Sequence, residues 1–168
     1  STFSPVICFG SVSATVWLLS YGIAYATPYP DIALWWFKVG HIGIVSIPAC
    51  ISLFTLAIVQ RVRVRLGLVL SAIAGSVGFG IAVLMNPSFI RGVATFPWGY
   101  YPTYGPLSVP FLLWFALLLA NSLQIFWIEY RRARTKIQTD RLRAFLWSFC
   151  VSYVGLVDYV AMDMKSPL

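Results

Sequence analysis

Five long apolar segments run along the chain, and short stretches with prolines or charged residues separate them. A helix needs about 20 apolar residues to cross the roughly 30 Å hydrocarbon core of a bilayer. Each segment reaches that length, so we predict an all-α fold: a polytopic transmembrane bundle of about five helices in a single membrane-embedded domain. The predicted helices cover about residues 6–26, 32–59, 66–85, 105–128 and 142–162.

Prolines mark several of the predicted helix ends. Pro28 and Pro30 stop the first helix, because proline has no amide hydrogen and its ring clashes with the preceding turn. Pro87 ends the third helix in the same way. Pro48 lies inside the second helix and is expected to kink it.

The composition excludes a soluble domain. Apolar residues make up 60% of the chain and charged residues 10%, and the mean hydropathy is +0.82, whereas a soluble domain carries about 25% charged residues. The net charge of +7 does not indicate nucleic-acid binding, because the basic residues lie in short clusters between apolar segments. The three cysteines lie inside those segments without a CxxC or Cys/His grouping. They predict neither a disulfide framework nor a metal site, and we expect no cofactor.

The Lys and Arg residues divide unevenly between the two sides of the bundle. Nine belong to one side: Arg61, Arg63, Arg65, Arg131, Arg132, Arg134, Lys136, Arg141 and Arg143. Three belong to the other: Lys38, Arg91 and Lys165. Because cytoplasmic loops are rich in Lys and Arg, we expect the arginine-rich links and the N-terminus of this segment in the cytoplasm. The C-terminus would then lie outside, which suggests an excerpt of a longer chain.

The link at 129–143, between the fourth and fifth predicted helices, is a solvated basic segment. Its expected partner is the layer of anionic lipid headgroups on the cytoplasmic side. Docking to a cytoplasmic domain is the alternative.

Two rows of small residues recur every four positions along the third predicted helix. They are Gly67, Ser71 and Gly75, and Ala72, Ser76 and Gly80. Small residues let helix backbones approach closely in lipid, so we predict that this helix is central in the bundle. The alternative is a lipid-facing helix that happens to be rich in glycine. In the second helix, Gly40 and Gly43 predict another point of close approach.

Three ionisable residues lie at membrane depth near the outer side. Lys38 and Asp158 fall in the outer leaflet, where we expect them to pair or together to line an outward-facing polar pocket. The alternative is that each contacts water or headgroups independently. His41 lies one turn from Lys38 on the same face of the helix. It is either a structural hydrogen-bonding residue or a contact in a ligand pocket, and it is a poor metal ligand because the chain has no second histidine.

The outer connection, residues 86–104, is long and rich in aromatic residues, proline and glycine. Such a segment could fold over the mouth of the bundle as a lid, with Trp98 and Tyr101 as candidate ligand contacts. The alternative is an aromatic belt that only anchors the bundle at the interface.

The order of these patterns resembles a known membrane domain. The segments that carry the resemblance are WLLSYGIAYA, ALWWFKVGHIGIVSIPACISLF, FIRGVATFPWGYYPTYGPL, YRRARTKIQTDRLRAFL and GLVDYVAMD. Together they resemble the N-terminal seven-helix sensory domain found ahead of bacterial sensor histidine kinases and diguanylate cyclases. The resemblance implies that the five helices are the second to sixth of seven, in the bacterial cytoplasmic (inner) membrane. It also implies that a seventh helix returns to the cytoplasm and carries an output domain.

No catalytic motif is present, so we do not expect an enzyme within these residues. The first hypothesis is a signal-transduction domain that binds an unknown stimulus in its outer half. The alternative is a non-catalytic accessory subunit that packs against other subunits of a larger membrane complex. A small transporter is the weakest hypothesis, because the sequence shows no internal repeat.

Overall fold

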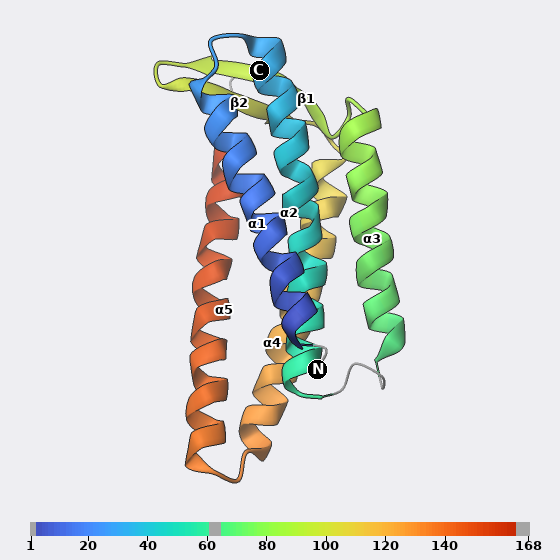
Figure 1. Ribbon diagram of the computed structural model, residues 1–168, viewed down its shortest axis with the longest axis vertical. Helices are drawn as coiled ribbons and strands as arrows, with labels where there is room; N and C mark the ends of the chain where they lie inside the picture. Colours follow the sequence, from blue (N-terminus) through green and yellow to red (C-terminus); the bar gives the residue numbers. More distant parts are fainter. Residues whose placement is uncertain (1–2, 61–64, 164–168) are drawn as a thin grey trace.

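The computed structural model describes the backbone of residues 3–60 and 65–163 and the side chains of residues 5–60 and 65–151. Within these residues lie five helices and a two-stranded hairpin. In chain order the elements are α1 (Phe3–Ala26), α2 (Pro30–Ile58), α3 (Leu66–Met85), β1 (Ile90–Phe96), β2 (Gly99–Tyr104), α4 (Ser108–Arg132) and α5 (Lys136–Asp163). The helices run along the long axis of the molecule, and the hairpin crosses one end of them (Figure 1).

This architecture confirms the predicted all-α membrane bundle. Among the described residues, the helices long and apolar enough to cross a bilayer are Pro5–Ala26, Pro30–Ile58, Leu66–Met85 and Ser108–Arg132. α4 and α5 reach further into the basic link than predicted, because backbone hydrogen bonding continues through charged turns that lie beyond the hydrocarbon. The fifth predicted span lies within α5. Its crossing of the membrane stays a prediction, because the side chains of residues 152–163 are outside the described part.

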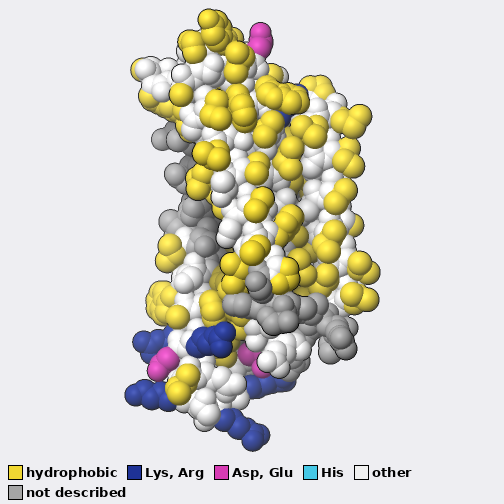
Figure 2. Space-filling view, viewed as in Figure 1, with side chains coloured by type: hydrophobic (Ala, Val, Ile, Leu, Met, Phe, Trp, Pro, Cys, Tyr) yellow, Lys and Arg dark blue, Asp and Glu magenta, His cyan; other side chains and the backbone are white. Residues whose placement is uncertain are grey.

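The two ends of the bundle differ in character. At one end, which we call the hairpin end, α1 and α3 finish and α2 and α4 begin. At the other, which we call the basic end, α2 and α4 finish and α3 and α5 begin. Figure 2 shows most of the visible Lys and Arg side chains gathered at the basic end. The fold therefore brings Arg65 to the same end as the link between α4 and α5, as the charge count requires.

The outer connection contains a hairpin that the sequence reading did not anticipate. β1 and β2 pair antiparallel from Ile90–Tyr104 to Phe96–Gly99, with an irregularity at Arg91. The strand residues are largely β-branched or aromatic, which favours pleated structure. Gly99 has a φ of 136°, a conformation that favours glycine, directly after the two-residue turn.

The helix at the centre of the described bundle is α2. Half of the residues in its apolar 18-residue stretch are buried, against 17% of those in the corresponding stretch of α3. The prediction of a central third helix is therefore wrong for the described residues. Gly75 packs against the ring of Trp114, and a Cβ on Gly80 would lie 3.8 Å from Val45, but Gly67 has open space around it. Small residues allow a close approach, but they do not specify which side of the helix a neighbour occupies.

The predicted close approach at Gly40 and Gly43 is confirmed. A Cβ on Gly40 would lie 2.7 Å from Cδ2 of Tyr21, and one on Gly43 would overlap the carbonyl oxygen of Ser13. The backbones of α1 and α2 touch here because neither glycine carries a side chain. This contact makes α1 and α2 the most extensively packed helix pair of the described bundle.

α2 continues as a helix through Pro48. Proline has no amide hydrogen to donate to the carbonyl oxygen of Ile44, four residues earlier. The hydroxyl of Ser76 on α3 donates to the carbonyl oxygen of Val45 at 2.8 Å. This bond joins α3 to α2 in the turn before the proline, at the carbonyl next to that of Ile44.

Candidate functional site

His41 lies on α2 where α1, α2 and the hairpin meet, and its side chain is fully buried. Its Nδ1 lies 2.8 Å from the carbonyl oxygen of Phe37, one turn earlier. A carbonyl only accepts, so we assign the ring hydrogen to Nδ1, which donates it to Phe37. The hydroxyl oxygen of Tyr21 on α1 lies 3.2 Å from the same nitrogen and can share that hydrogen. The imidazole is thus tied both to its own helix and to α1.

Three aromatic rings, from α1, β2 and the turn before β1, surround the imidazole. The ring centroids of Tyr104 on β2, Tyr21 on α1 and Phe89 before β1 lie 5.5, 5.7 and 6.0 Å from that of His41. Such distances are typical of packed ring pairs. A change in the position of the hairpin would therefore alter the packing around His41.

A series of rings leads from this buried cluster to the surface. Tyr101 lies 6.4 Å from Tyr104, and Trp98 at the hairpin tip lies 6.2 Å from Tyr101, centroid to centroid. The Trp98 ring also stacks on Phe96 at 5.1 Å and is 54% exposed. The two hairpin residues that the sequence singled out, Trp98 and Tyr101, thus lie in one continuous chain of contacts with His41.

The hairpin is attached to the turn between α1 and α2. The hydroxyl of Tyr100 donates to the carbonyl oxygen of Pro28 at 2.8 Å. The ring of Trp98 lies 5.9 Å from that of Tyr25 on α1. At the start of the hairpin, Phe89 and Ile90 are buried in a core cluster with Val83 of α3. The hairpin thus covers the end of the bundle and contacts three of its elements.

The predicted polar pair is only partly described. Lys38 lies on α2 one turn before His41 and is half-buried. The side chain of Asp158 lies outside the described residues, so its pairing with Lys38 stays a prediction. His41 contacts aromatic rings and a backbone carbonyl, and a structural hydrogen-bonding role fits this geometry directly.

The described members of the arginine clusters lie exposed at the basic end. They are Arg65, Arg131, Arg132, Arg134, Arg141 and Arg143. Arg61 and Arg63 lie outside the described residues. The guanidinium carbon of Arg131 lies 4.9 Å from the ring centre of Trp127, and Arg132 forms a 3.9 Å ion pair with Glu129.

A metal site is not supported by the described part of the chain. No group of three or more His, Cys, Asp or Glu side chains there is arranged to hold a metal ion. The cluster around His41 is instead built from aromatic partners that the sequence reading missed: Tyr21, Phe89 and Tyr104. One signal was available for Tyr21, because a tyrosine hydroxyl inside an apolar helix needs a hydrogen-bond partner.

Comparison with known protein families identifies a family whose model covers nearly the whole chain. The model of the family described as the N-terminal 7TM region of histidine kinase matches residues 4–166. Neither the curated proteins nor the solved structures contain a significant match to the chain.

Proposed function

This chain belongs to the family of N-terminal 7TM regions of histidine kinases and is a membrane sensory domain; from that premise we propose that its stimulus acts at the hairpin end. The region itself is non-catalytic, in agreement with the absence of catalytic motifs from the sequence. The kinase context indicates a cytoplasmic output domain as its partner.

The observation that carries the proposal is the chain of rings from Trp98 through Tyr101 and Tyr104 to His41. Its outer member is exposed and its inner member is buried on the central helix. A stimulus that moves the hairpin would change the packing of Tyr104 on His41, and α2 extends from there to the basic end. Such a signal requires the stimulus to bind two arrangements of the helices unequally.

We also propose the orientation and location of the domain. The excess of Lys and Arg at the basic end supports a cytoplasmic position for that end, with the hairpin outside. The basic link would then face the anionic headgroups of the inner leaflet of a bacterial cytoplasmic membrane.

The accessory-subunit hypothesis has one observation in its favour. Gly67 and Gly78 of α3 have open space where a side chain would be, and Ser71 beside them is exposed. A helix of another subunit could approach such a face closely. This face does not depend on the hairpin end, so the two functions are separable by experiment.

The coupling of the hairpin to α2 can be tested by NMR, because His41 is the single histidine of the chain. The domain is reconstituted in nanodiscs with isotope-labelled histidine, and the imidazole signals are recorded. Trp98→Ala, which removes a ring three contacts away from His41, is expected to shift those signals. Trp35→Ala is the matched control, since Trp35 is similarly exposed at 58% near the start of α2. Unchanged signals in Trp98→Ala, or an equal shift in both variants, would contradict the proposal.

The functional counterpart uses the complete kinase in vesicles and measures autophosphorylation. Trp98→Ala and Tyr104→Ala are expected to change the rate, whereas Trp35→Ala leaves it at the native level. If all three variants match the native protein, the hairpin does not communicate with the output domain.

A further inference from the structure

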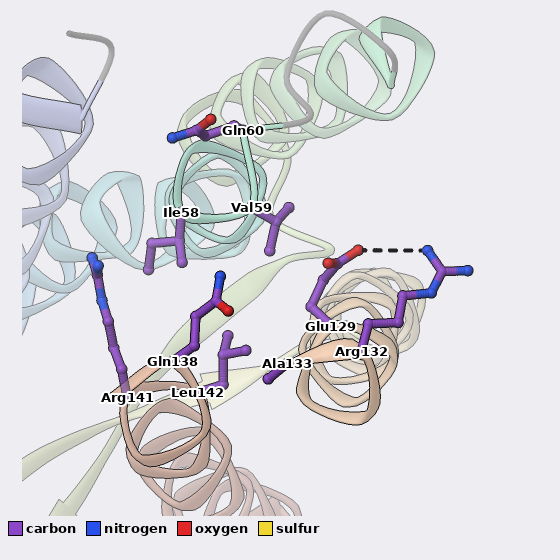
Figure 3. Close-up of a pocket in the computed structure, with 9 residues that line it drawn as sticks. All are labelled: Ile58, Val59, Gln60, Glu129, Arg132, Ala133, Gln138, Arg141 and Leu142. Atoms are coloured by element: carbon purple, nitrogen blue, oxygen red, sulfur yellow. Dashed lines mark ion pairs between the residues drawn. The ribbon is translucent and has the colours of Figure 1, made fainter. Parts of the chain in front are cut away.

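A pocket with a volume of about 330 Å³ opens at the basic end, between the ends of α2 and α4 and the first turns of α5 (Figure 3). The polar side chains that line it are Gln60, Glu129, Arg132, Gln138 and Arg141. We infer that this pocket binds the phosphodiester group of an anionic lipid headgroup. The inference makes the proposed headgroup contact of the basic end specific, and it does not depend on the stimulus site at the hairpin.

The wall formed by α5 supplies hydrogen-bond donors. Gln138 and Arg141 lie one turn apart, and Figure 3 shows both extending from α5 toward the end of α2. A guanidinium can donate two parallel hydrogen bonds to phosphate oxygens. The pocket is therefore lined by an amide and a guanidinium on the same side.

The position of these residues at the start of α5 adds to the attraction. α5 begins at Lys136, and the backbone N–H of Gln138 donates to Oγ1 of Thr135 at 3.3 Å, which marks the first turn of the helix. The first turn of a helix carries N–H groups without helical partners and the positive end of the helix dipole. The N–H of Gln138 is taken by Thr135, so the dipole and the remaining N–H groups of the first turn favour an anion at this end of α5.

The charges that line the pocket match one negative charge. Arg132 reaches back along the outer side of α4 to Glu129, with 3.9 Å between Nη1 and Oε1 (Figure 3). This pair is close to neutral, which leaves the guanidinium of Arg141 as the uncompensated charge of the described lining. A phosphodiester carries a single negative charge and balances it, whereas a phosphomonoester carries about 1.5–2.

Aromatic contacts place the pocket at the depth of lipid headgroups. Trp127 and Tyr130 of α4 stack at 5.9 Å, and Arg131 lies over Trp127. The guanidinium carbon of Arg141 lies 6.0 Å from the ring centre of Phe145. Tryptophan, tyrosine and arginine with apolar stems gather at the membrane interface. Apolar residues complete the lining and give an acyl chain a contact that inorganic phosphate cannot use: Ile58, Val59, Ala133 and Leu142.

The test measures the thermal unfolding of the purified chain in detergent during titration with short-chain lipids. Dihexanoyl phosphatidylglycerol is expected to raise the Tm saturably. The phosphatidylcholine analogue, whose headgroup is neutral overall, is expected to leave the Tm unchanged. In Arg141→Gln the phosphatidylglycerol affinity is expected to fall about tenfold, which corresponds to about 1.4 kcal/mol. Arg143→Gln is the matched control, because it removes the same charge from an exposed residue of the same helix that does not line the pocket.

Two further variants keep the test decisive if Arg141→Gln does not fold. Arg141→Lys retains the charge without the two-pronged donor, and Gln138→Leu retains the size without the amide. Each is expected to weaken binding about threefold or more. Equal affinities in the Arg141 and Arg143 variants, or equal responses to phosphatidylglycerol and phosphatidylcholine, would overturn the inference. Inorganic phosphate that binds as tightly as phosphatidylglycerol would overturn the assignment to a lipid.

Discussion

Gly43 is the residue at which the packing of α1 on α2 is most sensitive. A Cβ there would overlap the carbonyl oxygen of Ser13 and lie 2.9 Å from the backbone nitrogen of Trp17. Both are backbone atoms of α1, so they cannot move aside as the end of a side chain could. The packing of α1 against α2 therefore requires glycine, which has no Cβ, at this position.

We predict that Gly43→Ala destabilises the domain by about 1–3 kcal/mol, the usual cost of overpacking. The measurement is unfolding of the reconstituted protein in a detergent titration. Gly78→Ala on α3 is the control, because no heavy atom lies within 4 Å of the added Cβ. It is expected to be neutral or stabilising by up to about 1 kcal/mol, since alanine favours the helix. If both variants lose a similar amount of unfolding free energy, the contact between α1 and α2 is less close than in the structure.

The candidate site could be predicted only in part from single residues. His41 stands out in the sequence as a lone ionisable residue in an apolar helix, and Trp98 and Tyr101 stand out in an aromatic connection. Their link through Tyr104 joins residues far apart in the chain, and it depends on how the hairpin lies across the bundle. No local pattern contains that information.

At the scale of elements, the bond between Ser76 and Val45 distinguishes α3 from a helix held by apolar contact alone. We predict that Ser76→Ala destabilises the domain by about 0.6–1.7 kcal/mol, the range for hydrogen bonds between membrane helices. Ser71→Ala is the control on the same helix, since that exposed hydroxyl donates to the Leu68 carbonyl within α3 at 2.9 Å. Its effect is expected to be near zero in the same unfolding assay. Equal effects would show that the interhelical bond adds nothing to stability.

The positions of the helices were predictable because apolar length and proline placement are local properties. The α3 range of Leu66–Met85 agrees with the prediction, and α1 ends at Ala26 before the prolines as expected. The hairpin was missed because Pro102 and two glycines within it suggested an irregular loop. The backbone pairing of β1 with β2 across a two-residue turn forms despite the proline and the glycines. The arrangement of helices was not predictable from small residues, since α3 uses Gly75 and Gly80 for contacts but leaves Gly67 open.

At the scale of the whole molecule, the two ends are built for different surroundings. At the hairpin end, a series of aromatic rings leads from the surface to the buried His41. At the basic end, arginines lie around a polar pocket. α2 connects them, since it contributes His41 at one end and Ile58, at its finish, to the pocket at the other. A lipid that holds the end of α2 to the start of α5 would restrain the helix through which we propose the signal passes.

This division gives a topology that cysteine labelling can test. Arg91 on β1 and Arg134 between α4 and α5 are both exposed and lie at opposite ends. With the three native cysteines replaced, Arg91→Cys is expected to react with a membrane-impermeant maleimide in intact bacterial cells. Arg134→Cys is expected to react only after the cells are permeabilised, because translocating the arginine-rich link is unfavourable. Both variants replace an exposed arginine with cysteine, so a difference in labelling reports the side of the membrane on which each position lies. Labelling of Arg134→Cys in intact cells would place the basic end outside, and the output domain could then not be reached through α2 in the proposed direction.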